Sequence, residues 1–256
     1  MQRERASEPA IQLELPVHEA AQRRAEHLMI DEAGDVVRWR DDTGREVETG
    51  LHDYAVLYDV PGLYEAVYFL RFGGRAPHLL VEVLAQVVPP GERADLQVLD
   101  VGAGTGVVGE LLVAAGFRRI AGTDLEPASE RAVRRDRGQV YDDVRTMDLT
   151  RPGKDDLAWL RALAPQVVMV AGAIGFGHLP VEALAAVTRV LPPGGLLAVT
   201  VAYGFEEEPE LVGHGALLLG PAYRERARRK GLSRFTTNGG RLEVTALVFE
   251  RTEVQP

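Results

Sequence analysis

Short apolar runs alternate with segments of helical periodicity through the centre of the chain. The apolar runs predict buried strands at residues 98–101, 119–123, 140–146, 167–170 and 196–202. The segments between them predict helices at about 107–115, 128–137 and 154–163, and one more that Pro180 opens. Continuous apolar runs are typical of parallel strands covered on both faces. The pattern therefore predicts an α/β fold with a doubly wound, mostly parallel sheet.

The last part of the chain departs from this alternation. A basic segment, Tyr223 to Lys230, is predicted as a helix, and its interleaved Ala and Glu favour a solvated face over an RNA track. Beyond it, Arg234–Thr237 and Arg241–Phe249 flank Asn238-Gly239-Gly240. Asn-Gly between two strand-like runs indicates a β-hairpin. We expect this hairpin to add an antiparallel pair at one edge of the sheet.

Residues 1–50 fall outside any nucleotide-binding core in this pattern. Val17 to Met29 predicts an amphipathic helix, and two short runs on either side of Asp41–Gly44 predict a small hairpin. We treat 1–50 as an N-terminal appendage and 51–256 as the main domain. The segment from Tyr54 to Phe72 is dense in aromatic residues. With the appendage, it is expected to form a lid that keeps water from a bound ligand.

The most informative segment joins the first buried strand to the helix after it. Asp100 lies near the end of the strand, and Gly102, Gly104 and Gly106 occupy alternate positions in the turn. A glycine-rich turn between a parallel strand and a helix brings the backbone close to a ligand and aims helix N–H groups at it. The turn therefore predicts a site for a nucleotide-like cofactor.

Two cofactor classes compete for this turn. Gly104, Gly106 and Gly109 match the dinucleotide spacing, and Asp124 follows Gly104 by 20 residues (124 − 104). In a dinucleotide site, however, the first glycine directly follows the strand, whereas Gly104 lies three residues past Val101 (104 − 101). We therefore favour a register that begins at the strand end, with a nicotinamide or flavin site as the alternative.

The register that begins at the strand end is Asp100-x-Gly102-x-Gly104-x-Gly106. It resembles motif I of the class I S-adenosylmethionine-dependent methyltransferases. The resemblance covers about residues 54–202, strongly in motif I and loosely elsewhere. It implies a Rossmann-like, mostly parallel seven-stranded sheet with a C-terminal antiparallel hairpin, and S-adenosyl-L-methionine as the cofactor.

Acidic residues close the strands around the expected crevice, which in such a sheet lies at the carboxyl ends of the strands. Asp124 could accept both hydroxyls of a ribose, as the resemblance implies; the alternative is a helix N-cap before Pro127. The resemblance implies that Asp148 accepts from the adenine amino group, against the alternative of a surface turn. It places Asp100 near the methionyl amino group and tied to loop amides; a buried acid satisfied only by backbone N–H groups is the alternative.

Further cofactor contacts are expected around the same strand ends. They comprise Gly102, Ala103, Gly104 and Gly106 in the turn, Leu125 and Leu149 beside the acids, and Ala171 and Gly172 after the fourth strand. Upstream, Tyr58 and Tyr64 could close over the cofactor and Arg75 could hold its carboxylate, with core packing as the alternative for each tyrosine. Two segments resemble the methyltransferase-like subfamily first noted in the Williams–Beuren chromosomal region. They are Tyr58-Asp59 to Arg75-Ala76-Pro77, upstream of the glycine turn, and Gly175-Phe176-Gly177-His178-Leu179-Pro180, after the fourth strand.

The loop after the fourth strand, Ala171 to His178, should border the transferring methyl group. It lacks the Asn/Asp-Pro-Pro-Tyr type of motif found in methyltransferases of nucleic-acid or protein nitrogen. The resemblance therefore implies a small-molecule acceptor. His178 is the candidate catalytic base because an imidazole titrates near neutral pH; a residue held by hydrogen bonds at the start of the Pro180 helix is the alternative. His214, between two glycines in a segment expected to be a loop, is a weaker candidate for the acceptor site.

The composition of the chain limits the classes of partner and ligand that we expect it to bind. The net charge is −9, which disfavours a broad attraction to nucleic acid or to an anionic membrane. There is no cysteine, so disulfides and thiolate metal sites are excluded, and we expect no metal. No secretory apolar segment begins the chain and no run approaches a membrane span, so we expect a cytoplasmic protein. The expected partner is a small-molecule acceptor, with a homodimer left open.

These observations together predict an S-adenosylmethionine-dependent methyltransferase that acts on an oxygen or nitrogen of a small molecule, such as a secondary metabolite. Two alternatives stay open. The chain could be an enzyme of the same fold that binds the cofactor and catalyses another reaction, such as a cyclisation. It could also be a noncatalytic partner subunit.

Overall fold

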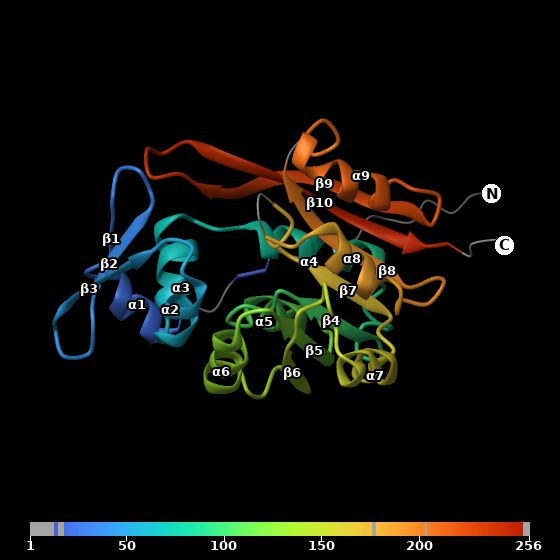
Figure 1. Cartoon of the computed structure of the whole chain (residues 1–256), viewed down its shortest axis with the longest axis horizontal. Helices are drawn as coiled ribbons and strands as arrows, with labels where there is room; N and C mark the ends of the chain where they lie inside the picture. Colours follow the sequence, from blue (N-terminus) through green and yellow to red (C-terminus); the bar gives the residue numbers. More distant parts are fainter. Residues whose placement is uncertain (1–12, 15–17, 176–177, 203, 253–256) are drawn as a thin grey trace.

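The computed structural model describes residues 13–14, 18–175, 178–202 and 204–252. Its large sheet contains β4 (Gln97–Val101), β5 (Arg119–Asp124), β6 (Asp143–Thr146), β7 (Val167–Val170), β8 (Leu196–Ala202), β9 (Tyr223–Phe235) and β10 (Arg241–Arg251). The strand order in this seven-stranded sheet is β6-β5-β4-β7-β8-β10-β9 (Figure 1). β4 to β8 pair in parallel, whereas β10 pairs antiparallel with both β8 and β9. The predicted fold class is confirmed, including the antiparallel hairpin at the C-terminal end.

Helices cover both faces of the large sheet. They are α4 (Ala76–Val87), α5 (Val107–Ala114), α6 (Pro127–Asp136), α7 (Lys154–Leu163), α8 (Val181–Thr188) and α9 (Val212–Leu218), with a short 3-10 turn η2 (Pro209–Leu211) before α9. Val98 of β4 belongs to one buried cluster with Leu111 of α5, while its neighbour Leu99 belongs to a second cluster with Leu184 of α8. Successive side chains of one strand therefore enter both layers. This arrangement explains why the central strands are apolar at consecutive positions.

The order of the strands reverses at β4. The chain adds β5 and then β6 on one side of β4, and then crosses over to add β7 and β8 on the other side. Ligands of doubly wound sheets bind outside the carboxyl ends of the strands at such a reversal. The fold therefore brings the turn after β4 and the loop after β7 to the same place.

The N-terminal part of the chain forms a small sheet of its own beside the aromatic segment (Figure 1). The N-terminal part consists of α1 (Glu19–Ala25), followed by the three strands of this sheet, β1 (Met29–Ile30), β2 (Val36–Arg40) and β3 (Glu46–Gly50). The aromatic segment folds as α2 (Tyr54–Asp59), α3 (Leu63–Glu65) and the π-helix η1 (Ala66–Arg71). Trp39 of β2 is buried in one cluster with Leu57, Leu63 and Ala132 of α6. The predicted hairpin is present as β2 and β3. The predicted helix is present but shorter, because Met29 belongs to β1, and Val17 lies outside the described residues. The domain boundary at residue 50 stays a prediction.

Two local predictions near the C-terminal end are wrong. Residues 223–230 belong to strand β9, not to a helix. Arg and Glu have good helix propensity, but alternation along β9 places Arg224 and Arg226 beside Glu250 of β10, and this cross-strand pairing outweighs propensity. The segment around His214, expected as a loop, forms α9.

Candidate functional site

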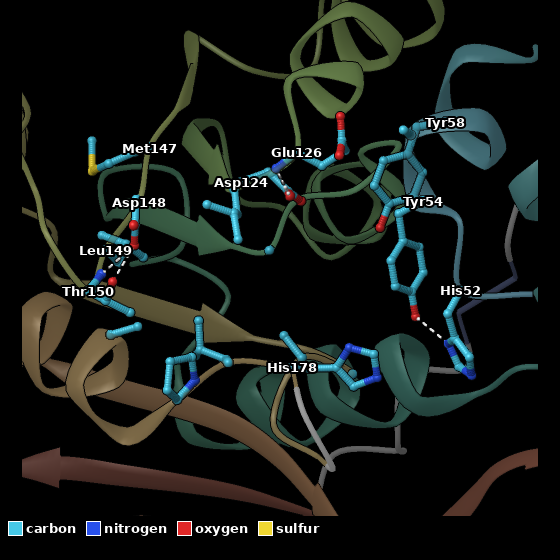
Figure 2. A pocket seen from close by; sticks show the side chains of 18 of the residues that line it. His52, Tyr54, Tyr58, Asp124, Glu126, Met147, Asp148, Leu149, Thr150 and His178 are labelled. Atoms are coloured by element: carbon cyan, nitrogen blue, oxygen red, sulfur yellow. Dashed lines mark hydrogen bonds between the residues drawn. The ribbon is translucent and has the colours of Figure 1, made fainter.

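A cavity of about 570 Å³ opens where the strand order reverses, between the strand ends and α2. Figure 2 shows side chains from both sides pointing into it. Ten of the predicted site residues line it: Tyr58, Tyr64, Gly102, Asp124, Leu125, Asp148, Leu149, Ala171, Gly172 and His178. Several other lining residues carry polar groups that the sequence reasoning did not single out: His52, Asp53, Glu126 and Thr150.

The other predicted site residues lie away from the cavity surface. Asp100, Ala103, Gly104 and Gly106 are buried behind its wall and are not among the lining residues. Arg75 precedes α4 with an exposed side chain, and its backbone N–H donates to the carbonyl of Ser233 at 2.7 Å. The structure thus brings ten of the proposed contacts to the cavity and leaves Arg75 outside it.

The glycine turn is shaped by one buried tyrosine that the sequence reasoning missed. A Cβ atom added at Gly109 would lie 2.4 Å from the ring of Tyr141, and one added at Gly122 would lie 3.0 Å from the same ring. Gly106 has φ +89°, in the left-handed region that favours glycine. Gly109, which made the spacing look like a dinucleotide motif, is therefore required by the packing of Tyr141. The sequence signal for this packing was Gly109 itself, but the sequence alone does not show that Tyr141 is the side chain packed against it.

Asp100 is completely buried and is held by a side chain instead of by the backbone. Its Oδ2 accepts a hydrogen bond from the Tyr141 hydroxyl at 2.7 Å, and its Oδ1 has no hydrogen-bond partner. Both sequence interpretations, a carboxylate tied to loop amides or one satisfied by backbone N–H groups, are therefore wrong in this detail. Burial raises the pKa of Asp100 to about 7, because water no longer stabilises its charged form.

Asp124 ends β5 and faces the cavity. Its Oδ2 accepts from the backbone N–H of Gly104 at 2.8 Å, and its Oδ1 accepts from the N–H of Glu126 at 2.9 Å. The alternative role as a helix cap is wrong, because Glu126 is the N-cap of α6 and accepts from Ala128. Burial raises the pKa of Asp124 while these two N–H donors lower it. A carboxylate has about four lone-pair sites, so acceptor capacity is left for a ligand.

Asp148 lies two residues beyond the end of β6 (148 − 146), on the cavity side of a turn. Its Oδ1 accepts from the backbone N–H of Thr150 at 2.9 Å and from the Thr150 hydroxyl at 2.6 Å. These hydrogen bonds lower the pKa of Asp148, so it stays ionised. The exposed side chain of Leu125 and the buried Leu149 add apolar surface next to the two acids. Asp148 thus stabilises the turn after β6 and also lines the cavity.

Tyrosines of α2 and α3 close the cavity from the other side. Tyr54 stacks on Tyr58 at a ring-centroid distance of 5.5 Å, and Tyr58 meets Tyr64 edge to face at 5.1 Å. Burial raises the pKa of Tyr58 and of Tyr64, so both hydroxyls stay protonated. The Tyr58 hydroxyl would lie 3.3 Å from a Cβ atom added at Gly104, which shows how closely this segment approaches the glycine turn.

His178, in the segment after β7, lines the cavity near His52 and Tyr54 (Figure 2). Its ring centroid is 5.8 Å from that of His52 and 5.9 Å from that of Tyr54. Desolvation and, second, the charge of His52 lower the pKa of His178, which favours a neutral imidazole at pH 7. His214 lies elsewhere: it is buried in α9, and its Nε2 is 2.9 Å from the carbonyl oxygen of Leu179.

A buried ion cluster ties the aromatic segment to the glycine turn. Arg137, at the end of α6, lies 2.9 Å from carboxylate oxygens of both Glu65 in α3 and Glu110 in α5. Its guanidinium also donates to the carbonyl of Thr105, and the Thr105 hydroxyl donates to Glu65 at 2.7 Å. Charged groups this deeply buried are costly unless paired, so the cluster holds its three elements together.

The cavity fits an adenosine-containing cofactor in the chemistry of its donors and acceptors. Asp124 offers an ionisable acceptor beside a glycine turn, and Asp148 lies one strand farther along the same edge. Gly172 has φ +71° and open space where a Cβ atom would be, so the backbone there can come close to a ligand. Ribose hydroxyls and an adenine amino group are the donors that two such carboxylates would bind.

Comparisons with known proteins agree with this geometry. A family model described as a methyltransferase domain matches residues 99–199. Methyltransferase-like protein 27 from Homo sapiens is 32% identical over 126 residues, which cover 49% of this chain and 48% of that protein. The chain thus matches about half the length of this relative. The matched methyltransferase domain and the shared fold confirm the predicted resemblance to class I methyltransferases, while the similarity to one subfamily stays a prediction.

Solved structures share the fold at low sequence identity. A protein from Pyrococcus horikoshii, provisionally assigned as an RNA methyltransferase, aligns with a TM-score of 0.51 and 12% identity, covering 70% of this chain and 85% of that chain. The 1,6-didemethyltoxoflavin-N1-methyltransferase of Burkholderia thailandensis aligns with a TM-score of 0.50 and 14% identity, covering 89% of this chain and 100% of that chain. At these identities the likeness establishes the fold.

In the part of the chain that the structure describes, no three or more His, Asp or Glu side chains form a group that could hold a metal ion. The described helices are also too short or too polar to cross a membrane.

Proposed function

We propose, from the match of residues 99–199 to a methyltransferase domain, that this chain is a class I S-adenosylmethionine-dependent methyltransferase that transfers a methyl group to a small-molecule acceptor. The observation that carries the proposal is Asp124, which faces the cavity with spare acceptor capacity while it holds the glycine turn through Gly104. The turn and the acid are thereby fixed relative to each other before a ligand binds. Such preorganisation reduces the entropy lost on binding.

Each end of the cavity has a separate task in this proposal. Asp124 accepts from the ribose hydroxyls and Asp148 from the adenine amino group, with Leu125 and Leu149 against the flat faces of the base. S-adenosylmethionine, when bound, supplies a methyl group on a positively charged sulfur. Tyr58 and Tyr64 exclude water from that region, and the small residues Ala171 and Gly172 leave room for an acceptor next to it.

Catalysis then depends chiefly on positioning. Well-oriented reactants can gain about 7–11 kcal/mol from proximity and alignment alone. His178 is the proposed base for an acceptor whose oxygen or nitrogen must lose a proton, and its lowered pKa keeps it neutral at pH 7. The net charge of −9 supports a small molecule instead of RNA, because RNA binding relies on cationic contacts to phosphates.

Binding of S-adenosylhomocysteine by calorimetry tests the proposal. We expect micromolar affinity or tighter for the full chain, and a loss of tens-fold or more in Asp124→Ala. Each charge-assisted hydrogen bond contributes about 1.5–3 kcal/mol, and about 1.4 kcal/mol corresponds to a factor of ten in affinity. Asp148→Ala should cost less, because its carboxylate is exposed. Asp95→Ala, an exposed acid outside the cavity lining, is the matched control.

An unchanged affinity in a folded Asp124→Ala variant would contradict the ribose role. Absence of S-adenosylhomocysteine binding by the unaltered chain would contradict the cofactor and the function together. Methyl transfer itself is measured by the mass increase of an acceptor matched to equimolar S-adenosylhomocysteine formation.

His178→Ala separates the base from a structural role. If His178 is the base, turnover of a hydroxyl acceptor falls by about 10²–10⁴ while cofactor affinity is retained. If the residue only supports the start of α8, the melting temperature falls and turnover changes by no more than a few-fold.

A further inference from the structure

The lining of the cavity changes in character from one end to the other (Figure 2). Asp124 and Asp148 lie at the strand ends, where the proposed adenosine site is. His52, Tyr54 and His178 lie at the opposite side, and they come from two segments far apart in the sequence, the start of α2 and the loop after β7. A cofactor bound by the two acids would leave this second end for the acceptor.

Three rings form a nearly equilateral group at this second end. The centroid of His52 is 6.0 Å from that of Tyr54, the His52 and His178 centroids are 5.8 Å apart, and Tyr54 and His178 are 5.9 Å apart. The Nδ1 of His52 and the Tyr54 hydroxyl are 3.3 Å apart. Leu179 and Pro180 add apolar surface beside the rings. Planar side chains around an apolar patch favour a planar ligand through stacking and edge contacts.

The charge of the lining is one-sided. It includes the acids Asp53, Asp124, Glu126 and Asp148, and the described lining contains neither Lys nor Arg. The guanidinium of Arg234, in the terminal hairpin, has a lowering effect on the pKa of Tyr54. However, its Cζ lies 4.9 Å from the centroid of the Phe72 ring, and Arg234 does not line the cavity. Of these acids, Asp53 lies between His52 and Tyr54 in the chain. An acceptor with a carboxylate or phosphate at this end would therefore meet an acid and no Lys or Arg of the described lining to pair with.

We infer that His52, Tyr54 and His178 form the acceptor subsite, and that it takes a planar acceptor with a transferable proton and no negative charge; this inference rests on the proposed methyltransferase function. In the reaction, a bond forms between the acceptor oxygen or nitrogen and the methyl carbon. The methyl–sulfur bond breaks with its electron pair left on sulfur, and the acceptor proton passes to His178. His52 is a positioning residue: its ring lies 5.8 Å from that of His178 and, second to desolvation, its electrostatic interaction lowers the pKa of His178.

Three probes with one shared phenol ring test the charge rule. Tyramine is cationic, 4-ethylphenol is neutral and 4-hydroxyphenylacetate is anionic. Each is titrated into the full chain saturated with S-adenosylhomocysteine, and the histidine ring signals are followed by NMR, with His52→Gln and His178→Gln used for assignment. We expect the cation and the neutral probe to shift both signals, and the anion to bind at least about tenfold more weakly, which corresponds to about 1.4 kcal/mol.

Equal or tighter binding of the anion would overturn the charge rule. A failure of all three probes to move the His52 and His178 signals would overturn the subsite. If S-adenosylhomocysteine itself does not bind, the proposed function fails, and the same ranking of probes on the free protein then decides the subsite by itself.

The positioning role of His52 has a separate readout. In His52→Gln, the pKa of His178 followed by NMR titration should rise part of the way toward its ordinary value, because desolvation remains while the electrostatic interaction with His52 is lost. His27→Gln, which replaces an exposed histidine outside the cavity lining, should leave the pKa of His178 unchanged. An unchanged pKa in both variants would show that His52 does not act on His178.

Discussion

At the scale of single residues, Asp100 carries an electrostatic cost in the ligand-free chain. Its carboxyl is fully buried with one oxygen unpartnered, and burial raises its pKa from 3.8 to about 7. The folded state therefore retains a proton that the unfolded chain loses as the pH rises above about 4. The contribution of Asp100 to stability is greatest below that pH, falls as the pH rises to about 7, and is constant above it.

Asp100→Asn should therefore stabilise the free protein at pH 8 and change little at pH 4. One pKa unit corresponds to about 1.4 kcal/mol, so the gain in the free energy of unfolding is at most about 4 kcal/mol. The Asn carbonyl can still accept from Tyr141, while the new amide N–H group reduces the gain. Urea unfolding at both pH values measures the difference, with the exposed Asp95→Asn as the control. A gain of the same size at both pH values would refute the assigned pKa.

At the scale of elements, Arg137 links α6 to α3, α5 and the glycine turn. Arg137→Met should lower the free energy of unfolding by about 3–5 kcal/mol, because Glu65 would be left buried without its partner. Adding Glu65→Gln should recover part of the loss. Arg134→Met, which breaks an exposed pair with Glu130, should cost under about 1 kcal/mol. Similar losses in the two single arginine variants would show that burial of the cluster is unimportant.

The aromatic segment is the element proposed to act as a lid. Tyr54, Tyr58 and Tyr64 reach the cavity from helices that lie apart from the large sheet. Residues 54–75 should gain protection from hydrogen exchange when S-adenosylhomocysteine is added, because closure over a ligand suppresses local opening. Strand β9 lines no part of the cavity and serves as the internal reference. Protection confined to residues 98–150 would remove the lid.

At the scale of the whole molecule, cofactor binding should raise the melting temperature of the protein. A ligand at a hundred times its dissociation constant stabilises the folded state by about 2.7 kcal/mol, which shifts the melting temperature of a chain this size by about 5–10 °C. S-adenosylhomocysteine should produce this shift and NAD should not, since Gly109 accommodates Tyr141 and is not needed for a pyrophosphate. A larger shift with NAD would reverse the choice of cofactor.

The sequence by itself determined those features of this protein in which the local backbone structure requires a particular type of residue. Apolar runs predicted the central strands because a parallel strand between two helical layers must be apolar on both faces. Positive φ angles in the turn after β4 demand glycine, so Gly102, Gly104 and Gly106 revealed the turn in advance. The acids at the strand ends were predicted because parallel strands end at one edge of the sheet.

Only the tertiary structure decided the features that depend on partners distant in the sequence. Strand β9 is a strand because β10 pairs with it, although its own residues favour a helix. Tyr141 reaches Asp100 from 41 residues away, and His52 meets His178 across two separate segments. No local period encodes such contacts. They form because folding buries apolar surface from segments that are distant in the sequence. That burial brings the polar groups of these segments next to one another, whatever their separation along the chain.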